Sequence, residues 1–289
     1  MPPRDPRTGR RDGRPAEHPR SPRPLVVEGA QAWSAGSDGA GDLGDARVGV
    51  LALHGFTGSP ASVGPWARAL RAAGAEVAVP RLPGHGTSVA DLDRSTWRDW
   101  YSLARADLHR LAGRCDVVVV AGLSMGGALA LRLAVHEPEH VAGLALVNPA
   151  VLLADPLLPL LPLLRRVRRT VPGVADDIAA EGVTELGYDR VPLRALSSFV
   201  ALMADVRADL PRVRQPVLVA SSRRDHVVPA ASARTVRERV GSDDVRDVRL
   251  EQSFHVATLD HDLPLVVDET LRLVRDVVAA RAGADGVPA

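Results

Sequence analysis

The chain has 289 residues, enough for one large α/β domain or for a domain with an inserted cap. Its formal net charge of +1 at pH 7 argues against a nucleic-acid-binding protein, because no basic surface dominates. The single cysteine, Cys115, permits no internal disulfide, and no apolar run approaches the roughly 18 residues of a membrane span. We therefore expect a cytoplasmic protein. Its core must consist mainly of Leu, Val and Ala, because only 3% of the residues are aromatic.

Residues 1–46 are predicted to form a disordered N-terminal tail and a flexible insert. Residues 1–23 are rich in arginine and proline and have hardly any apolar side chains, so they cannot bury enough surface to offset their chain entropy. No apolar segment follows these arginines, which argues against a secretory signal. A short strand is a candidate at 24–27, before the flexible Ser/Gly/Asp run at 34–45.

From residue 47 onward, apolar β-branched runs alternate with segments of helix formers. Strands are expected at 48–53, 75–79, 116–121, 141–147, 216–220 and 245–250. Helices are expected between them, at about 62–73, from 95 through 108, from 128, at about 230–240 and at about 263–281. This alternation predicts a mostly parallel sheet covered by helices on both faces.

Residues 151–205 interrupt the alternation, because they contain many prolines and no run typical of a buried strand. We interpret them as a helical cap inserted into the α/β core. The predicted organisation is a tail and insert at 1–46, core at 47–150, cap at 151–205, core at 206–281, and a flexible C-terminus at 282–289.

The pentapeptide Gly122-Leu123-Ser124-Met125-Gly126 follows a predicted buried strand and precedes a predicted helix. Gly-x-Ser-x-Gly in this context is typical of a nucleophile elbow, a sharp and strained turn that lifts the serine hydroxyl above the sheet. A side chain in place of either glycine would clash across so tight a turn. Ser124 is therefore predicted to be a catalytic nucleophile.

A serine nucleophile needs a base to take its proton and an acid that holds the base in the right tautomer. After such an elbow, the acid is expected beyond a later strand and the histidine later still. Asp225 follows the strand at 216–220, and His255 follows the strand at 245–250. Both lie beyond the carboxyl ends of strands, where the active sites of open α/β sheets gather. The predicted catalytic set is Ser124, Asp225 and His255.

Other residues compete for these roles: His226, His261, Asp260, His54 and His85. His226 is too near the predicted acid in the chain to point back at it comfortably. His54 is better explained as a structural residue that holds its loop through ring hydrogen bonds. His109, His136 and His140 lie on predicted helices and are interpreted as solvated surface residues.

Acyl transfer also needs hydrogen-bond donors aimed at the oxyanion of the tetrahedral intermediate. The backbone N–H of Met125, directly after the nucleophile, is one predicted donor. The second is the N–H of Phe56, in the loop after the early strand. No cluster of His, Cys, Asp or Glu has metal-ligand spacing in the sequence, so we expect neither a metal nor a cofactor.

Five segments resemble the bacterial monoacylglycerol lipase and carboxylesterase family of α/β-hydrolases: His54-Gly-Phe-Thr-Gly-Ser-Pro, Gly84-His-Gly-Thr, Gly122-Leu-Ser-Met-Gly-Gly, Ser222-Arg-Arg-Asp-His-Val-Val-Pro and Phe254-His-Val-Ala-Thr-Leu-Asp. The similarity spans about 47–281 and includes the cap segment at 177–186. It implies the same nucleophile, acid, base and oxyanion donors as the residues themselves. The tail and the insert at 34–45 have no recognisable counterpart in that family.

The cap run at 157–164 alternates Leu with Pro, so it cannot form one straight helix, yet it is too apolar for an exposed loop. One interpretation is a pair of helices packed on the sheet. The other is a lid that receives the acyl chain, with Leu157 and Leu161 in contact with substrate. In the second interpretation Glu181, in the segment that resembles the family, binds the glycerol hydroxyls, and the arginines at 165–169 face an anionic membrane.

The sequence thus predicts a serine ester hydrolase with a small lipid ester as substrate, monoacylglycerol being favoured. Two alternatives stay open: a generalist carboxylesterase or thioesterase for short to medium chains, and a ligand sensor that keeps the hydrolase fold without turnover. Peripheral membrane contact through the cap is a further expectation, and the sequence does not indicate an oligomeric state.

Overall fold

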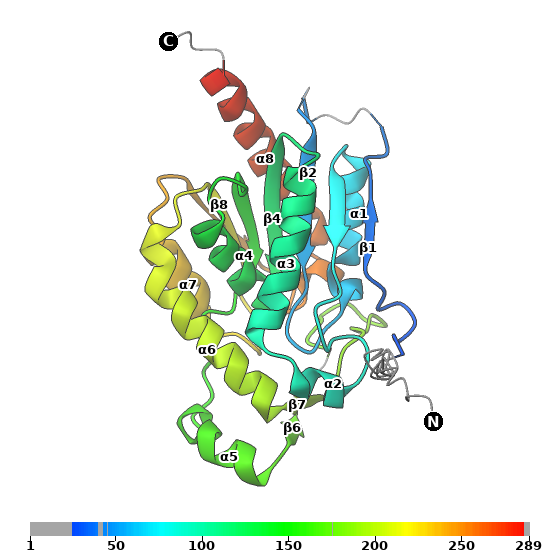
Figure 1. Ribbon diagram of the computed structural model, residues 1–289, viewed down its shortest axis with the longest axis vertical. Helices are drawn as coiled ribbons and strands as arrows, with labels where there is room; N and C mark the ends of the chain where they lie inside the picture. The colour runs from blue at the N-terminus through cyan, green and yellow to red at the C-terminus, as the bar shows by residue number, and fades with distance from the viewer. Residues whose placement is uncertain (1–24, 40–42, 45, 175, 286–289) are drawn as a thin grey trace, which may run out of the picture.

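A mostly parallel sheet forms the centre of the computed structural model, which describes residues 25–39, 43–44, 46–174 and 176–285 (Figure 1). Within these residues the sheet has the strand order β1-β3-β2-β4-β5-β8-β9, and only β1 runs antiparallel to its neighbour. The strands are β1 (Trp33–Ala35), β2 (Val48–Leu53), β3 (Glu76–Val79), β4 (Val117–Leu123), β5 (Gly143–Val147), β8 (Val217–Ser222) and β9 (Val245–Leu250).

Helices cover both faces of the sheet, because successive side chains of its central strands point to opposite sides. Leu51 and Val120 pack with the helices of one face, and Val50 and Val119 pack with those of the other. The first face is covered by α3 (Trp97–Ala112), α4 (Met125–His136), α6 (Leu193–Asp209) and α7 (Ala230–Arg239). The second face is covered by α1 (Gly64–Ala72) and α8 (Leu263–Asp285). The predicted fold class is therefore confirmed.

The N-terminal edge of the sheet differs from the prediction. No strand forms at residues 25–27, where Leu25 is 91% exposed, because the chain turns at 27–30 through Gly29, whose φ is +84°. The edge strand is β1, which pairs with β3 and overlaps the start of the run at 34–45 that was predicted to be flexible. The predicted tail at 1–23 lies outside the described residues.

The cap lies between β5 and β8 and contains α5 (Leu161–Val167), β6 (Thr170–Pro172), β7 (Arg190–Pro192) and α6. Figure 1 shows α5, β6 and β7 projecting beyond one end of the sheet. The antiparallel pair β6–β7 was not predicted, because three-residue strands are too short to show a periodic pattern. The last cap helix also continues to Asp209, beyond the predicted boundary at 205.

Several smaller elements complete the described chain. The helix α2 (Val89–Arg94) was not predicted, and α8 continues to Asp285, past its expected end at 281. Short 3-10 helices lie at Pro60–Val63, Leu158–Leu160, Leu210–Arg212 and Ala257–Leu259. Among the described residues, no helix combines the length and apolar character needed to cross a membrane.

Candidate active site

Ser124 occupies the turn between the end of β4 and the start of α4, as the motif predicts. Its φ is 55°, a left-handed conformation that strains a residue with a side chain. Backbone hydrogen bonds hold it there: the N–H of Ser124 donates to the Val147 carbonyl at 3.0 Å, and its carbonyl accepts from Ala150 at 3.1 Å. The surrounding strands therefore impose the strained turn.

The two glycines of the motif, Gly122 and Gly126, lie where no side chain fits. A Cβ added to Gly122 would lie 2.4 Å from the backbone of Gly126, and one added to Gly126 would lie 2.1 Å from the carbonyl oxygen of Leu53. Both separations are far shorter than atoms tolerate, and backbone cannot move aside as a flexible side chain can. The predicted clash across the turn is confirmed for Gly122, whereas at Gly126 the space is limited by the end of β2.

Asp225 and His255 meet across the loops that follow β8 and β9. The Nδ1–H of His255 donates to a carboxylate oxygen of Asp225 at 2.8 Å, and the other oxygen accepts the N–H groups of Val227 and Val228, both at 2.8 Å. Because Nδ1 carries this proton, Nε2 is the free basic atom of the ring. Both side chains are buried and line the same cavity as Ser124.

The pKa of His255 reflects two opposing effects. Burial alone would lower it, because an imidazolium loses its hydration. The hydrogen bond and the negative charge of Asp225 outweigh burial, so the pKa is raised above its ordinary value. The charge of Glu185 acts in the same direction.

Polar residues at the ends of β5 and β8 fix the histidine loop. The side-chain amide of Asn148 donates to the His255 carbonyl at 2.8 Å, and its oxygen accepts the N–H of Ser222 at 2.7 Å. The Ser222 hydroxyl donates to the Phe254 carbonyl at 2.7 Å. These two residues were not predicted, although a polar side chain at the carboxyl end of a buried strand can indicate such a role.

The cap contributes a buried carboxylate, Asp177, to the same loops. It accepts the backbone N–H groups of His255 at 3.0 Å and of His226 at 3.1 Å, and it also accepts the Nδ1–H of His226 at 2.7 Å. Asp260 makes a second connection, because it accepts the N–H groups of Ala179 at 2.7 Å and of Phe254 at 2.9 Å. Two carboxylates therefore tie the cap segment to the histidine loop.

The other residues considered for the catalytic roles have different surroundings. The imidazole of His226 bonds to Asp177, and the carboxylate of Asp260 bonds to backbone N–H groups. The side chain of His261 is 51% exposed. His54 and His85 are fully buried, with their ring centroids 4.9 Å apart.

His54 holds the loop that carries the second predicted oxyanion donor. Its Nε2 accepts the N–H of Leu82 at 3.2 Å, so its Nδ1 carries the proton and donates to the Gly55 carbonyl at 2.9 Å. Because a trans peptide is planar, fixing the Gly55 carbonyl directs the N–H of Phe56 to the opposite side. Burial lowers the pKa of His54 to about 4, which keeps this arrangement neutral. The predicted structural role of His54 agrees with these bonds.

Both predicted oxyanion donors border Ser124. Met125 is the first residue of α4, where N–H groups have no acceptor within the helix. A Cβ added to Gly55, directly before Phe56, would lie 3.4 Å from the Cβ of Ser124. Both N–H groups thus belong to backbone segments next to the serine, and they remain the predicted donors of an oxyanion hole.

A cavity of about 600 Å³ opens beside Ser124 and His255. Its wall toward the cap is mainly apolar and comprises Leu153, Ala154, Pro156, Leu158, Val171, Pro172, Val174, Val191, Leu196 and Phe199. A cavity of this size and character suits one small ligand with a long apolar part.

The three substrate-binding residues predicted in the cap do not line this cavity. Leu157 is 54% exposed, Leu161 is buried elsewhere, and Glu181 is exposed. The 3-10 helix at Leu158–Leu160 places Leu158, and not its neighbour Leu157, in the wall. Glu181 precedes Gly182, whose φ of +74° turns the chain, and the glutamate of this segment that lines the cavity is Glu185.

Glu185 is a half-buried carboxylate in the cavity wall. One of its oxygens accepts the Ser62 hydroxyl at 2.6 Å, and a Cβ added to Gly58 would lie 2.6 Å from that oxygen. Burial raises the pKa of Glu185, while the hydrogen bond from Ser62 and the proximity of His255 oppose the shift. The predicted carboxylate, Glu181, lies four residues away, because the cap has no periodic pattern that indicates which side chains face the cavity.

A strained serine at a strand–helix turn, with a buried Asp–His pair beyond later strands of a parallel sheet, defines the class of serine hydrolases with an α/β fold. The chain matches the alpha/beta hydrolase family over residues 50–276, and it belongs to that family.

Relatives of known activity are lipases and esterases. The thermostable monoacylglycerol lipase of Bacillus sp. (strain H-257) is 38% identical over 78% of this chain and 89% of its own length. The carboxylesterase of Bacillus subtilis (strain 168) is 28% identical over 75% of this chain and 88% of its own. The predicted resemblance and the predicted class, a serine ester hydrolase, are confirmed.

Solved structures of lipolytic enzymes share the fold of this chain. A structure from the work on LipS and LipT, two metagenome-derived lipolytic enzymes, superposes with a TM-score of 0.81 at 40% identity and covers 87% of this chain and 100% of its own. The monoacylglycerol lipase of Paleococcus ferrophilus has a TM-score of 0.68 at 20% identity, covering 86% of this chain and 99% of its own, and shows the shared fold.

Proposed function

We propose that this protein hydrolyses monoacylglycerols, with Ser124, His255 and Asp225 as its catalytic triad. The observation that carries the proposal is the half-buried carboxylate of Glu185 in a cavity beside the serine whose wall toward the cap is mainly apolar. A fatty acyl chain matches the apolar wall, and a glycerol headgroup supplies hydroxyl donors for the carboxylate.

The first half of the reaction forms an acyl-enzyme. Nε2 of His255 takes the hydroxyl proton of Ser124 while Oγ attacks the ester carbonyl carbon. The resulting oxyanion accepts hydrogen bonds from the N–H groups of Phe56 and Met125. When the intermediate collapses, the C–O bond to glycerol breaks, and His255 returns its proton to the departing glycerol oxygen.

The second half of the reaction is hydrolysis of the acyl-enzyme. His255 takes a proton from water, whose oxygen attacks the acyl carbon, and the same oxyanion donors stabilise the second intermediate. Its collapse frees the fatty acid and returns the proton to Ser124. Asp225 stays ionised throughout and holds the imidazole in the tautomer that both halves need.

Glu185 supports selectivity for a monoester. An ionised carboxylate accepts strong hydrogen bonds from the two free hydroxyls of a monoacylglycerol. A triacylglycerol has no hydroxyl to offer, so one carboxylate oxygen would keep its hydrogen bond from Ser62 while the other would be covered without a donor, and such loss of pairing disfavours binding. We expect this difference to distinguish the protein from a generalist esterase.

Replacing Glu185 by glutamine is expected to raise KM for monoacylglycerol by about 10-fold or more, because hydrogen bonds to charged groups contribute about 1.5–3 kcal/mol. Turnover of p-nitrophenyl butyrate, which lacks the diol, should change little. The measurement is steady-state kinetics on both substrates. The matched control is Glu181→Gln, in the same cap segment but exposed. Equal losses on both substrates would remove Glu185 from the diol site.

We also propose that the outer surface of the cap contacts anionic membranes, while the protein itself works in the cytoplasm. Leu157, Leu160, Leu163 and Val167 expose more than half of their surface on and next to α5. The exposed side chains of Arg165, Arg166, Arg168 and Arg169 lie in the same segment. Apolar side chains flanked by arginines suit an interface with acidic lipid headgroups.

Changing these four cap arginines to glutamine is expected to weaken binding to phosphatidylserine-containing vesicles by about 1 kcal/mol per residue, the usual contribution of a basic group near an anionic surface. Vesicle cosedimentation at several salt concentrations measures the effect. The control changes four exposed arginines outside the cap: Arg98, Arg223, Arg249 and Arg272. If both quadruple variants lose the same affinity, the cap has no special role in membrane contact.

A further inference from the structure

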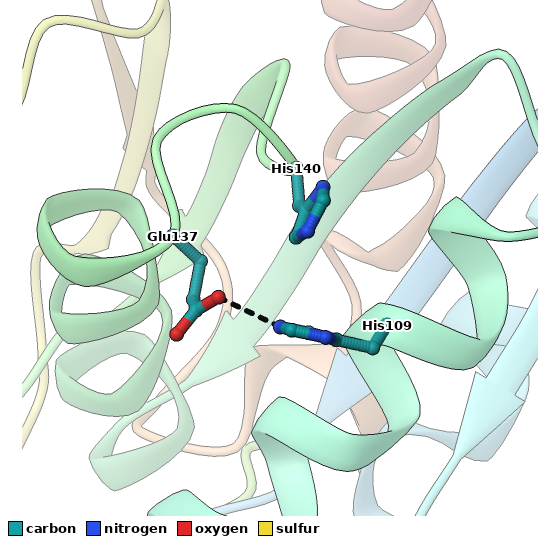
Figure 2. Close-up of side chains that lie close together, drawn as sticks. All are labelled: His109, Glu137 and His140. Atoms are coloured by element: carbon teal, nitrogen blue, oxygen red, sulfur yellow. Dashed lines mark hydrogen bonds and ion pairs between the residues drawn. The ribbon is translucent and has the colours of Figure 1, made fainter.

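A cluster of two imidazoles and a carboxylate lies far from the active site: His109, Glu137 and His140 (Figure 2). One ligand atom from each residue lies within 4.8 Å of the other two. Both histidines were predicted to be solvated surface residues, because their spacing in the sequence is not that of metal ligands. The group becomes visible only when α3 and the segment after α4 are brought together.

Local structure explains why Glu137 and His140 converge. Pro138 cannot continue α4, so the helix ends at the preceding residues. The chain then forms a turn in which the N–H of His140 donates to the Glu137 carbonyl at 3.0 Å. The two side chains thus come from the two ends of a single turn.

The helix α3 supplies the rest of the cluster. Arg105 and His109 are four residues apart, so they lie on the same face of the helix, and both contact the carboxylate of Glu137. The Nε2–H of His109 donates to one oxygen at 2.7 Å, and Arg105 donates to the other. The ring of His140 lies edge-on to that of His109, with 4.7 Å between their centroids.

We propose that His109, Glu137 and His140 form a zinc-binding site. Two imidazole nitrogens and one carboxylate oxygen are a ligand set that Zn²⁺ prefers, with water at the fourth position. Donors on a tetrahedral zinc ion with ligand distances of about 2.0–2.2 Å lie roughly 3.3 Å from one another. The three donor atoms are close enough to reach this geometry through side-chain rotation. Zinc replaces the proton that His109 shares with Glu137, and this proton leaves to solvent.

The surroundings of the cluster suit a dication. The Glu137 side chain is only 6% exposed and is oriented by Arg105, which leaves its other oxygen for the metal. The two histidine side chains are 41% and 33% exposed, so an ion can enter from solvent. The carboxylate of Glu139 lies 3.7 Å from His140 and adds a second negative charge, which Arg105 only partly offsets.

The location assigns the site a stabilising role. Ser124 precedes α4 and Glu137 follows it, so the two residues are about 20 Å apart at 1.5 Å per residue. A zinc ion at the far end would join α3 to the turn after α4 without touching the reacting atoms. We therefore expect zinc to change the melting temperature and to leave turnover unaltered.

The test uses the full, untagged chain after treatment with a chelator and dialysis. Isothermal titration with ZnCl₂ should give one site per chain, and zinc should raise the melting temperature. His140→Ala should weaken binding by about 10-fold or more, because it removes a ligand while the hydrogen bonds of Glu137 to Arg105 and His109 stay in place. Cobalt(II) in place of zinc should give the intense visible bands of tetrahedral coordination, and these should be lost in the variant.

His261→Ala is the matched control, since it removes another partly exposed histidine elsewhere on the molecule. It should bind zinc as the wild type does. Three results would overturn the proposal: no zinc binding by the wild type, equal affinity in His140→Ala and wild type, or equal losses in the two histidine variants. Unchanged ester turnover in His140→Ala would show in addition that the variant remains folded.

Discussion

Replacing Ser124 by alanine is expected to lower kcat by about 10⁴- to 10⁶-fold, because the unit of serine, histidine and aspartate loses its nucleophile. The fold should survive, since alanine keeps the Cβ and the backbone bonds to Val147 and Ala150. The melting temperature should therefore stay close to that of the wild type. Turnover of a p-nitrophenyl ester and labelling by a fluorophosphonate probe measure the two expected losses.

Ser102→Ala provides the comparison for this prediction, because Ser102 is an exposed serine on α3. It should retain both turnover and labelling. If Ser124→Ala kept even a tenth of the wild-type rate, the nucleophile would have to be another residue. Such a result would leave the strained turn at Ser124 without a catalytic explanation.

Asp225→Asn is expected to lower kcat by about 10⁴-fold, as loss of the tautomer-holding carboxylate does in such triads. It should also move the pH profile. In the wild type, kcat/KM falls as pH falls through the raised pKa of His255, because an imidazolium cannot accept the serine proton. The variant keeps the burial that lowers this pKa and loses the hydrogen bond and charge that raise it. Its residual activity should therefore persist to lower pH.

Rate profiles of kcat/KM against pH test both parts of this prediction. Asp243→Asn is the control, because Asp243 is an exposed aspartate after α7. It should leave both rate and profile unchanged. A profile whose acidic limb stays at the wild-type position in Asp225→Asn would show that another group controls the ionisation of His255.

The core of the site could be predicted because its residues follow from rules of strand order. Buried strands are recognisable as apolar runs, and parallel strands place their carboxyl ends at one edge of the sheet. The residues that follow β4, β8 and β9 must therefore lie near one another, which selects Ser124, Asp225 and His255 in that order. The crowding at Gly122 is local to the motif, whereas that at Gly126 comes from the end of β2.

The cap could not be predicted in the same way. Its short helices and three-residue strands have no period from which the facing side can be deduced. Glu181 and Glu185 are therefore equivalent in the sequence, although only Glu185 lines the cavity. Contacts such as those of Asp177 and Asn148 join segments that are distant in the chain, and no local pattern specifies them.

The carboxylate of Asp177 limits how a substrate can enter. A cap that lifted as one rigid unit would strip the hydrogen bonds from the backbone of His255 and His226, and the general base would lose its support. The outer arm, from α5 to β6, shares none of these bonds. Motion confined to that arm would open the cavity while the segment around Asp177 stays hydrogen-bonded to the histidine loop. The enzyme can then exchange substrate and product and keep its proton-transfer machinery assembled between turnovers.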